Sequence, residues 1–269
     1  MLSLIWRTIK DRKVSLVAYS LGALIFMEMY VAMFPFFAEK QEEFDKLLQA
    51  YPKEVFQAMG MDLADFTLSN FESFLGVEHF SLVWPIMVII FVIAFGGAQI
   101  AGEIEKGTIE TILAQPISRL KIFLGKYLAG VASIVAFCVV SIFAVIPLAA
   151  LHGVEYRLEN YWTMSILGFL FALAIFSLSM LAASIFSEKG KSNFTVGGII
   201  ILMYVINVIS SFKESLKDLR YLSFFYYYDY SMAIIDNKID GLTIWVFLGV
   251  SVVAAILGAL WFMRRDIAA

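Results

Sequence analysis

The chain has 269 residues and a formal net charge of −3; 61% of its residues are hydrophobic and only 16% are charged. Soluble domains contain about 45–50% apolar and about 25% charged residues, so this composition excludes a soluble globular protein. It also excludes a disordered chain, because disorder requires low hydrophobicity and high charge. The single cysteine, Cys138, excludes an internal disulfide, and two histidines, His79 and His152, are too few for a histidine-rich metal site. The composition indicates a polytopic membrane protein.

Six apolar runs are long enough to cross a hydrocarbon core of about 30 Å, which requires about 20 helical residues. The runs cover residues 14–37, 80–100, 122–151, 161–186, 194–212 and 242–263. They are continuous rather than alternating, which favours helices over barrel strands. The third run is long enough to be tilted or to end in the interface near Pro147, and no cleavage signal precedes the first. We expect one all-α domain of six transmembrane helices over residues 1–269.

The distribution of Lys and Arg residues predicts the orientation. An even number of spans puts both termini on one side, together with the connections between spans two and three and between spans four and five. Twelve of the 20 Lys and Arg residues lie on that side, in short segments, and the other eight are spread over longer loops. Because short cytoplasmic loops carry an excess of positive charge, we expect a multi-pass protein of the cell membrane with both termini in the cytoplasm.

The first outer loop, residues 38–79, carries nine carboxylates against three lysines. Apolar side chains recur in this loop at helical spacing, with charged residues between them. The apolar positions are Phe44, Leu47, Leu48, Tyr51, Val55, Phe56 and Met59. This pattern predicts an amphipathic helix, bent at Pro52, that lies on the membrane or on a partner.

A second outer segment, residues 213–241, is rich in aromatic side chains. They include Phe224, Phe225, Tyr226, Tyr227, Tyr228 and Tyr230. Clustered Phe and Tyr side chains suit the headgroup region, where a ring can be half-buried while its hydroxyl stays in water. We expect an interfacial anchor, and the alternative is a gate for a substrate.

The densest motif is the connection between spans two and three, residues 102–119. Thr108 is placed to cap a short helix, and Glu110 lies in the first turn of that helix, where an anion is favourable. The apolar residues of this helix share one face; they are Ile109, Ile112 and Leu113. Pro116 would end the helix, and Ser118 would cap the next one.

Gly107 precedes the short helix and predicts a sharp turn, because glycine tolerates positive φ. The carboxylates of Glu103, Glu105 and Glu110 could bind a basic groove, and the apolar face would offer a ridge beside them. A short amphipathic helix held at the membrane surface suits docking on another protein. The alternative is a charged turn that only fixes the topology.

In this segment the chain resembles the permease subunits of ABC-2-type transporters, which carry an E-x-x-x-G-T-x-E-x-x-L-x-x-P-x-S-R signature after the second span. The matching residues are Glu103, Gly107, Thr108, Glu110, Leu113, Pro116, Ser118 and Arg119. The resemblance extends to six spans and a basic N-terminal segment. It implies that this segment, including Glu105, couples the chain to an ABC ATP-binding subunit. It also implies that two permease subunits, identical or related, form a dimer in the lipid bilayer.

The sequence has no G-x-x-x-x-G-K-[ST] loop, so we do not expect this chain to hydrolyse ATP. ATP and Mg²⁺ are expected on the partner subunit; no catalytic residue, metal site, bound cofactor or nucleic-acid partner is expected here. The resemblance implies ATP-driven export or extrusion of a hydrophobic or amphipathic compound, such as a drug, peptide or lipid-like molecule. The alternative is a membrane sensor or scaffold that recruits a cytoplasmic ATPase. An intramembrane enzyme is least favoured, because no H-E-x-x-H motif is present.

Glu28 lies about fifteen residues into the first span, where a carboxylate is costly and is a functional candidate. It could line a transport path, pair with a polar group on a neighbouring helix, or be protonated. Gln99, at the end of span two, and Asn207, in span five, are candidate hydrogen-bond partners. The sequence leaves these interpretations open.

Overall fold

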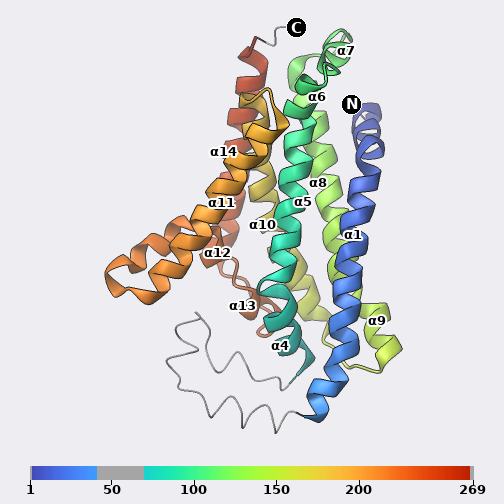
Figure 1. Cartoon of the computed structure of the whole chain (residues 1–269), viewed down its shortest axis with the longest axis vertical. Helices are drawn as coiled ribbons and strands as arrows, with labels where there is room; N and C mark the ends of the chain where they lie inside the picture. The colour runs from blue at the N-terminus through green and yellow to red at the C-terminus, as the bar shows by residue number, and fades with distance from the viewer. Residues whose placement is uncertain (1, 41–69, 267–269) are drawn as a thin grey trace.

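The structure is a computed structural model that describes residues 2–40 and 70–266, and within these ranges it contains helices and no strand. Six long helices form an elongated bundle (Figure 1). They are α1 (Leu2–Glu39), α5 (Val83–Gln99), α8 (Arg119–Phe143), α10 (Leu158–Ile185), α11 (Lys189–Phe212) and α14 (Gly241–Arg264). The amphipathic helix expected at residues 44–59 lies outside the described residues. The chain is an all-α polytopic membrane protein.

Five of the described helices are long and apolar enough to cross a membrane. By itself α5 falls short, because its 17 residues extend over about 26 Å. It is preceded by α4 (Phe71–Leu75) and the π-helical η1 (Gly76–Phe80), which meet it at 45°. Pro85 has no N–H to donate to the carbonyl of Ser81, so the helix breaks at this point. The six expected spans are present when this bent pair counts as one.

Two other helices differ in extent from the expected runs. α1 starts at Leu2, and its 38 residues extend over about 57 Å. The third run is divided at Ala144 into α8 and α9 (Val145–His152). Pro147 has no N–H to donate to the carbonyl of Phe143, which interrupts the hydrogen-bond ladder. The irregularity expected near Pro147 is therefore a break within the run.

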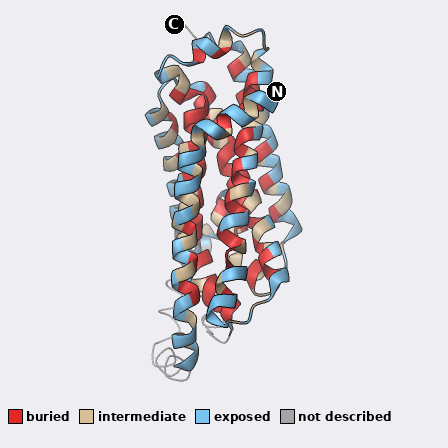
Figure 2. Ribbon diagram, turned by 90° about the vertical axis from the view of Figure 1, so that its right-hand side faces the viewer, coloured by how far each residue is buried: buried red, intermediate tan, exposed pale blue. Residues whose placement is uncertain are grey.

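α10 occupies the centre of the bundle, and buried residues in general face the bundle interior (Figure 2). α14 packs along α10, and α5 and α8 also contact it. Two glycines permit these close contacts: a Cβ at Gly168 would lie 2.5 Å from the ring of Trp84, and one at Gly96 would lie 2.5 Å from Cβ of Ser179. The buried Trp84 also donates a hydrogen bond to Oγ of Ser141 at 2.9 Å. The core is thus closely packed between helices.

α11 diverges from the other long helices toward the end opposite the chain termini (Figure 1). Most of its length is not buried within this chain. Three short elements then lead back to α14: the 3₁₀ helix η2 (Glu214–Leu222), α12 (Phe224–Tyr227) and α13 (Tyr230–Ile234). The divergence leaves a space between α11 and α5.

Part of the aromatic segment lies in the core. Phe224 and Tyr228 are buried, and the Tyr228 ring centroid lies 4.6 Å from that of Phe171 on α10. The Tyr228 hydroxyl donates to the carbonyl of Phe80 at 3.2 Å. The prediction of an interfacial anchor is therefore wrong for these residues, because the chain folds back onto α10. Tyr221 remains exposed.

Candidate functional site

The signature segment lies at the same end of the bundle as both described ends of the chain (Figure 1). It contains two short helices, α6 (Ala101–Glu105) and α7 (Ile109–Leu113). Gly107 has a φ of +69°, and the amides of Gly107 and Thr108 donate to the carbonyls of Ile104 and Glu103. This is the Schellman arrangement, in which glycine takes the left-handed position after a helix. The sharp turn predicted at Gly107 is confirmed.

The two capping predictions have different outcomes. Ser118 has extended backbone angles, and its hydroxyl accepts a hydrogen bond from the amide of Lys121 at 3.4 Å, so it caps α8 as expected. Thr108 has helical backbone angles, and its hydroxyl donates to the carbonyl of Glu103 at 3.3 Å instead of capping α7. The predicted cap at Thr108 is wrong, because the Schellman turn already fixes this residue.

The apolar face of α7 packs against its own chain. Ile109 and Ile112 are buried in the core, and Leu113 packs against the core. The expectation that Ile109 and Ile112 offer a ridge to a partner is therefore wrong, and for the partly buried Leu113 it stays a prediction. α7 ends before Pro116, as expected. Glu110 and Thr111 of α7 are exposed, and so is Ala114, which directly follows the helix.

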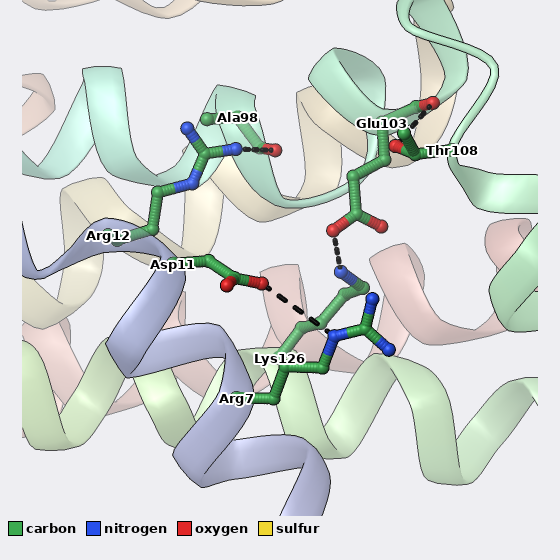
Figure 3. Close-up of polar contacts among 7 residues, drawn as sticks. All are labelled: Arg7, Asp11, Arg12, Ala98, Glu103, Thr108 and Lys126. Carbon is green, nitrogen blue, oxygen red and sulfur yellow. Dashed lines mark hydrogen bonds and ion pairs between the residues drawn. The ribbon is translucent and has the colours of Figure 1, made fainter.

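The carboxylates of the segment have different environments. Oε1 of Glu103 lies 2.6 Å from Nζ of Lys126 on α8, whose side chain is 1% exposed (Figure 3). Oε2 of Glu105 accepts a hydrogen bond from the amide of Lys189 at 2.9 Å, at the start of α11. Glu110 is exposed. Glu103 is therefore directed into the chain, whereas Glu110 lies on the outward face of α7.

Arg119, the last residue of the signature, begins α8 and donates to the carbonyl of Arg265. Arg265 donates in turn to the carbonyls of Ser184 and Phe186 at 3.0 Å each. Burial lowers the pKa of the Arg265 guanidinium, which still remains charged because arginine is not deprotonated in proteins. These bonds join α8 to the ends of α10 and α14. The sequence contains both arginines but no pattern that pairs them.

The three polar candidates within the predicted spans lie apart. Oε1 of Glu28 lies 2.9 Å from Nε2 of His152 in α9, and the Glu28 side chain is 45% exposed. Gln99 lies at the opposite end of the bundle, where it is 1% exposed. The carbonyl of Asn207 accepts hydrogen bonds from the hydroxyls of Ser210 and Ser211. Glu28 is therefore paired with His152. The prediction that Gln99 or Asn207 would be its hydrogen-bond partner is wrong. Among the described residues, no group of three His, Cys, Asp or Glu side chains could hold a metal ion.

An apolar cavity of about 490 Å³ lies between α5 and α11. Aliphatic side chains from both helices form most of its wall, and Phe225 also contributes. The polar groups at the cavity come from Ser81, Asn193 and Tyr204. Oδ1 of Asn193 is buried and has no hydrogen-bond partner among the described residues. The sequence did not identify this cavity, because it depends on the divergence of α11.

Comparison with known sequences adds a separate observation. The profile described as ABC-2 family transporter protein matches residues 3–267, nearly the whole chain. A search of the curated proteins finds no match. The signature segment and the helical bundle agree with the family match. The chain therefore belongs to the ABC-2 family of transporter proteins, and it is a membrane permease component of an ABC transporter.

Proposed function

We propose that this chain exports a hydrophobic or amphipathic compound, as one of two permease subunits driven by separate ATP-binding subunits. The observation that carries the proposal is the apolar cavity between α5 and α11. ATP and Mg²⁺ would be bound by the partner subunits, since this sequence has no phosphate-binding loop.

The cavity has the size and the chemistry of a binding site for an apolar compound. Its volume of about 490 Å³ falls within the range of about 300–1,000 Å³ that is usual for ligand pockets. An apolar ligand would gain about 25 cal/mol for each Å² of surface removed from water. Tyr204 also lines the cavity, and its hydroxyl could form a hydrogen bond with a polar group of an amphipathic compound. The ligand's apolar part would lie against the aliphatic wall.

The connections of α7 support a route from an ATP-binding subunit to the cavity. Glu110 is exposed on α7 and available to a partner. The Schellman turn at Gly107 joins α7 to α6, and α6 follows directly after α5, which lines the cavity. A displacement of α7 would therefore be transmitted to one wall of the cavity. The buried Glu103–Lys126 pair holds α6 to α8 during such a movement.

The proposal is tested by filling the cavity. Gly197 lines the cavity, and a Cβ at this position would meet no atom within 4 Å, so Gly197→Leu places its side chain in open space. We expect the affinity for a transported compound to fall about tenfold, because overpacking a site costs roughly 1–3 kcal/mol. The measurement is compound-stimulated ATP hydrolysis and transport in proteoliposomes that contain the partner ATPase.

Gly249→Leu on α14 is the matched control, because a Cβ at this exposed glycine also meets no atom within 4 Å. It should respond to the compound as the wild type does. An unchanged response in Gly197→Leu would show that the cavity is not the substrate site. ATP hydrolysis without movement of any compound would instead favour the sensor or scaffold.

A further inference from the structure

A second cavity, of about 300 Å³, lies at the end of the bundle that carries the chain termini. Its wall is formed by the first part of α1, the end of α5, α6, the turn that precedes α7, α7 itself and α8. It is separate from the apolar cavity, and its wall includes the Glu103–Lys126 pair. We refer to it below as the polar cavity.

The polar cavity carries an excess of positive charge. Six charged side chains line it, four of them cationic and two anionic: Arg7, Arg12, Lys106, Lys126, Asp11 and Glu103. Arg7 and Arg12 interact electrostatically with the buried Lys126, which has the same sign of charge. Like charges that line one cavity repel one another, and an anion bound among them would reduce this repulsion.

Two residues that line the polar cavity each carry a buried polar atom with no hydrogen-bond partner among the described residues: Nε2 of Gln99 and Oε2 of Glu103. Gln99 is 1% exposed, so its amide gains little from water. Buried polar groups are nearly always hydrogen-bonded, and an unsatisfied one costs about 1–3 kcal/mol. Both atoms therefore point to a ligand that can accept one hydrogen bond and donate another.

The existing contacts leave donors for such a ligand. Arg12 uses Nη2 to donate to the carbonyl of Ala98 at 2.8 Å, and Nε of Arg7 lies 3.8 Å from Oδ2 of Asp11. Each guanidinium has five N–H groups, so most of them remain available. Figure 3 shows Arg7, Glu103 and Lys126 directed toward a common space from three different helices. Lys106 lies at the rim and is exposed.

We propose that the polar cavity binds a phosphate group that also carries a hydrogen-bond donor. A phosphate offers several strong acceptor oxygens, and guanidinium groups bind phosphate in a bidentate geometry. The Gln99 amide and the cationic side chains would donate to the phosphate, and Oε2 of Glu103 would accept from the ligand's hydroxyl or ammonium group. Basic pockets between transmembrane helices near the cytoplasmic surface bind lipid headgroups. Both a lipid headgroup and free hydrogen phosphate have the required chemistry.

A bound phosphate would join α1 to the segment that precedes α7. Arg7 and Arg12 belong to α1, whereas Lys106 lies in the turn that contains Gly107. The ligand would therefore stabilise the position of α1 relative to the signature segment. This effect gives a measurable consequence in the isolated chain.

The test uses the purified full-length chain in an uncharged detergent. Its thermal unfolding is followed with inorganic phosphate, with a short-chain phosphatidylglycerol, and with a phosphatidylcholine of the same chain length. We expect the midpoint to rise by about 5 °C at a saturating concentration of the bound compound, because a ligand that binds only the folded state stabilises it. Phosphatidylcholine should have a smaller effect, since its headgroup cannot donate to Glu103. The rise should weaken at high ionic strength.

Two variants and one control locate the site. Gln99→Leu should lower the affinity for the phosphate compound about tenfold, while its midpoint without ligand stays equal or rises, because it removes an unsatisfied amide. Lys106→Gln removes an exposed charge at the rim and should lower the affinity about threefold to tenfold. Lys13→Gln removes an exposed charge of α1 outside the polar cavity and should leave the affinity unchanged.

A rise with phosphatidylglycerol alone supports the site with a lipid as its source, and a rise with inorganic phosphate supports it with a soluble source. The proposal is overturned if neither inorganic phosphate nor phosphatidylglycerol raises the midpoint, or if phosphatidylcholine raises it as much as phosphatidylglycerol does. It is also overturned if Gln99→Leu and Lys106→Gln keep the wild-type shift, or if Lys13→Gln loses it to the same degree.

Discussion

Lys126 carries its charge in a site that is nearly closed to solvent, and the carboxylate of Glu103 lies 2.6 Å away. Removing two ions from water is costly, and their attraction offsets that cost only when both are present. The pair therefore contributes little net stability compared with an apolar pair, but the loss of one partner is expensive. This asymmetry can be measured directly.

Glu103→Gln should lower the free energy of unfolding by about 3 kcal/mol, because it leaves a buried ammonium without a counter-charge. The double variant Glu103→Gln/Lys126→Met should recover most of this loss. Thermal or denaturant unfolding in detergent measures both. Lys191→Gln breaks the exposed Lys191–Glu188 pair and is the control, with an expected loss below about 1 kcal/mol. Equal losses in Glu103→Gln and Lys191→Gln would contradict the assignment.

At this scale the sequence identified the unusual residues better than their partners. Glu28 and Gln99 were both singled out, yet Glu28 pairs with His152, more than a hundred positions away, and Gln99 lines the polar cavity. Pairing depends on how helices are rotated and how far each extends, which the apolar pattern leaves undetermined. α1 begins twelve residues earlier than the first apolar run, so Glu28 lies farther along its helix than expected.

At the scale of the elements, α7 illustrates the limit of an amphipathic pattern: it predicts the helix but not what the apolar face packs against. The pattern correctly indicated a short helix between Gly107 and Pro116. An apolar face has the same sequence whether it packs on its own chain or on a partner, so the inward packing of Ile109 and Ile112 could not be predicted. The sequence indicated an irregularity near Pro147 but not the break before Pro85, although both follow from a missing N–H, which acts locally.

Glu110→Lys reverses the charge on the outward face of α7 without disturbing a described internal contact. We expect association with the ATP-binding subunit to weaken about tenfold, since attraction becomes repulsion at an exposed position. Co-purification of the ATPase and substrate-stimulated ATP hydrolysis are the measurements. Glu155→Lys, an exposed substitution in the loop before α10, is the control and should have no effect.

Gly107→Val provides a second arm of the same experiment. A β-branched residue at a φ of +69° is strained by about 1–3 kcal/mol, which should displace α7 and weaken association. Gly107→Asn should be milder, because asparagine tolerates the left-handed region. If Glu110→Lys and Gly107→Val both associate as the wild type does, α7 is a topological turn and not a coupling element.

For the whole molecule, helix number and composition were well predicted, whereas the arrangement of helices was not. The family match over residues 3–267 and the helical bundle agree with the sequence-based expectation. The central position of α10 and the divergence of α11 arise from contacts between distant segments. Neither helix is distinguished by its length or mean composition alone.

The orientation is testable with cysteine labelling, since the sole natural cysteine, Cys138, is buried. In intact cells Lys238→Cys should react with a membrane-impermeant reagent, and Lys106→Cys should react only after permeabilisation, as the excess of Lys and Arg near the termini predicts. Both positions are exposed in the structure. The reverse pattern of labelling would place the termini outside the cytoplasm.

The central position of α10 also has a consequence for biosynthesis. α10 is made before α14, the helix that packs along it, so it must stay in the membrane for a time with one side uncovered. Its serines are suited to this interval: the hydroxyls of Ser177, Ser179 and Ser184 donate to carbonyls one turn earlier in the same helix. Such bonds satisfy the hydroxyls before any neighbouring helix arrives. α10 can therefore remain in lipid at little cost until translation supplies the helix that completes its surroundings.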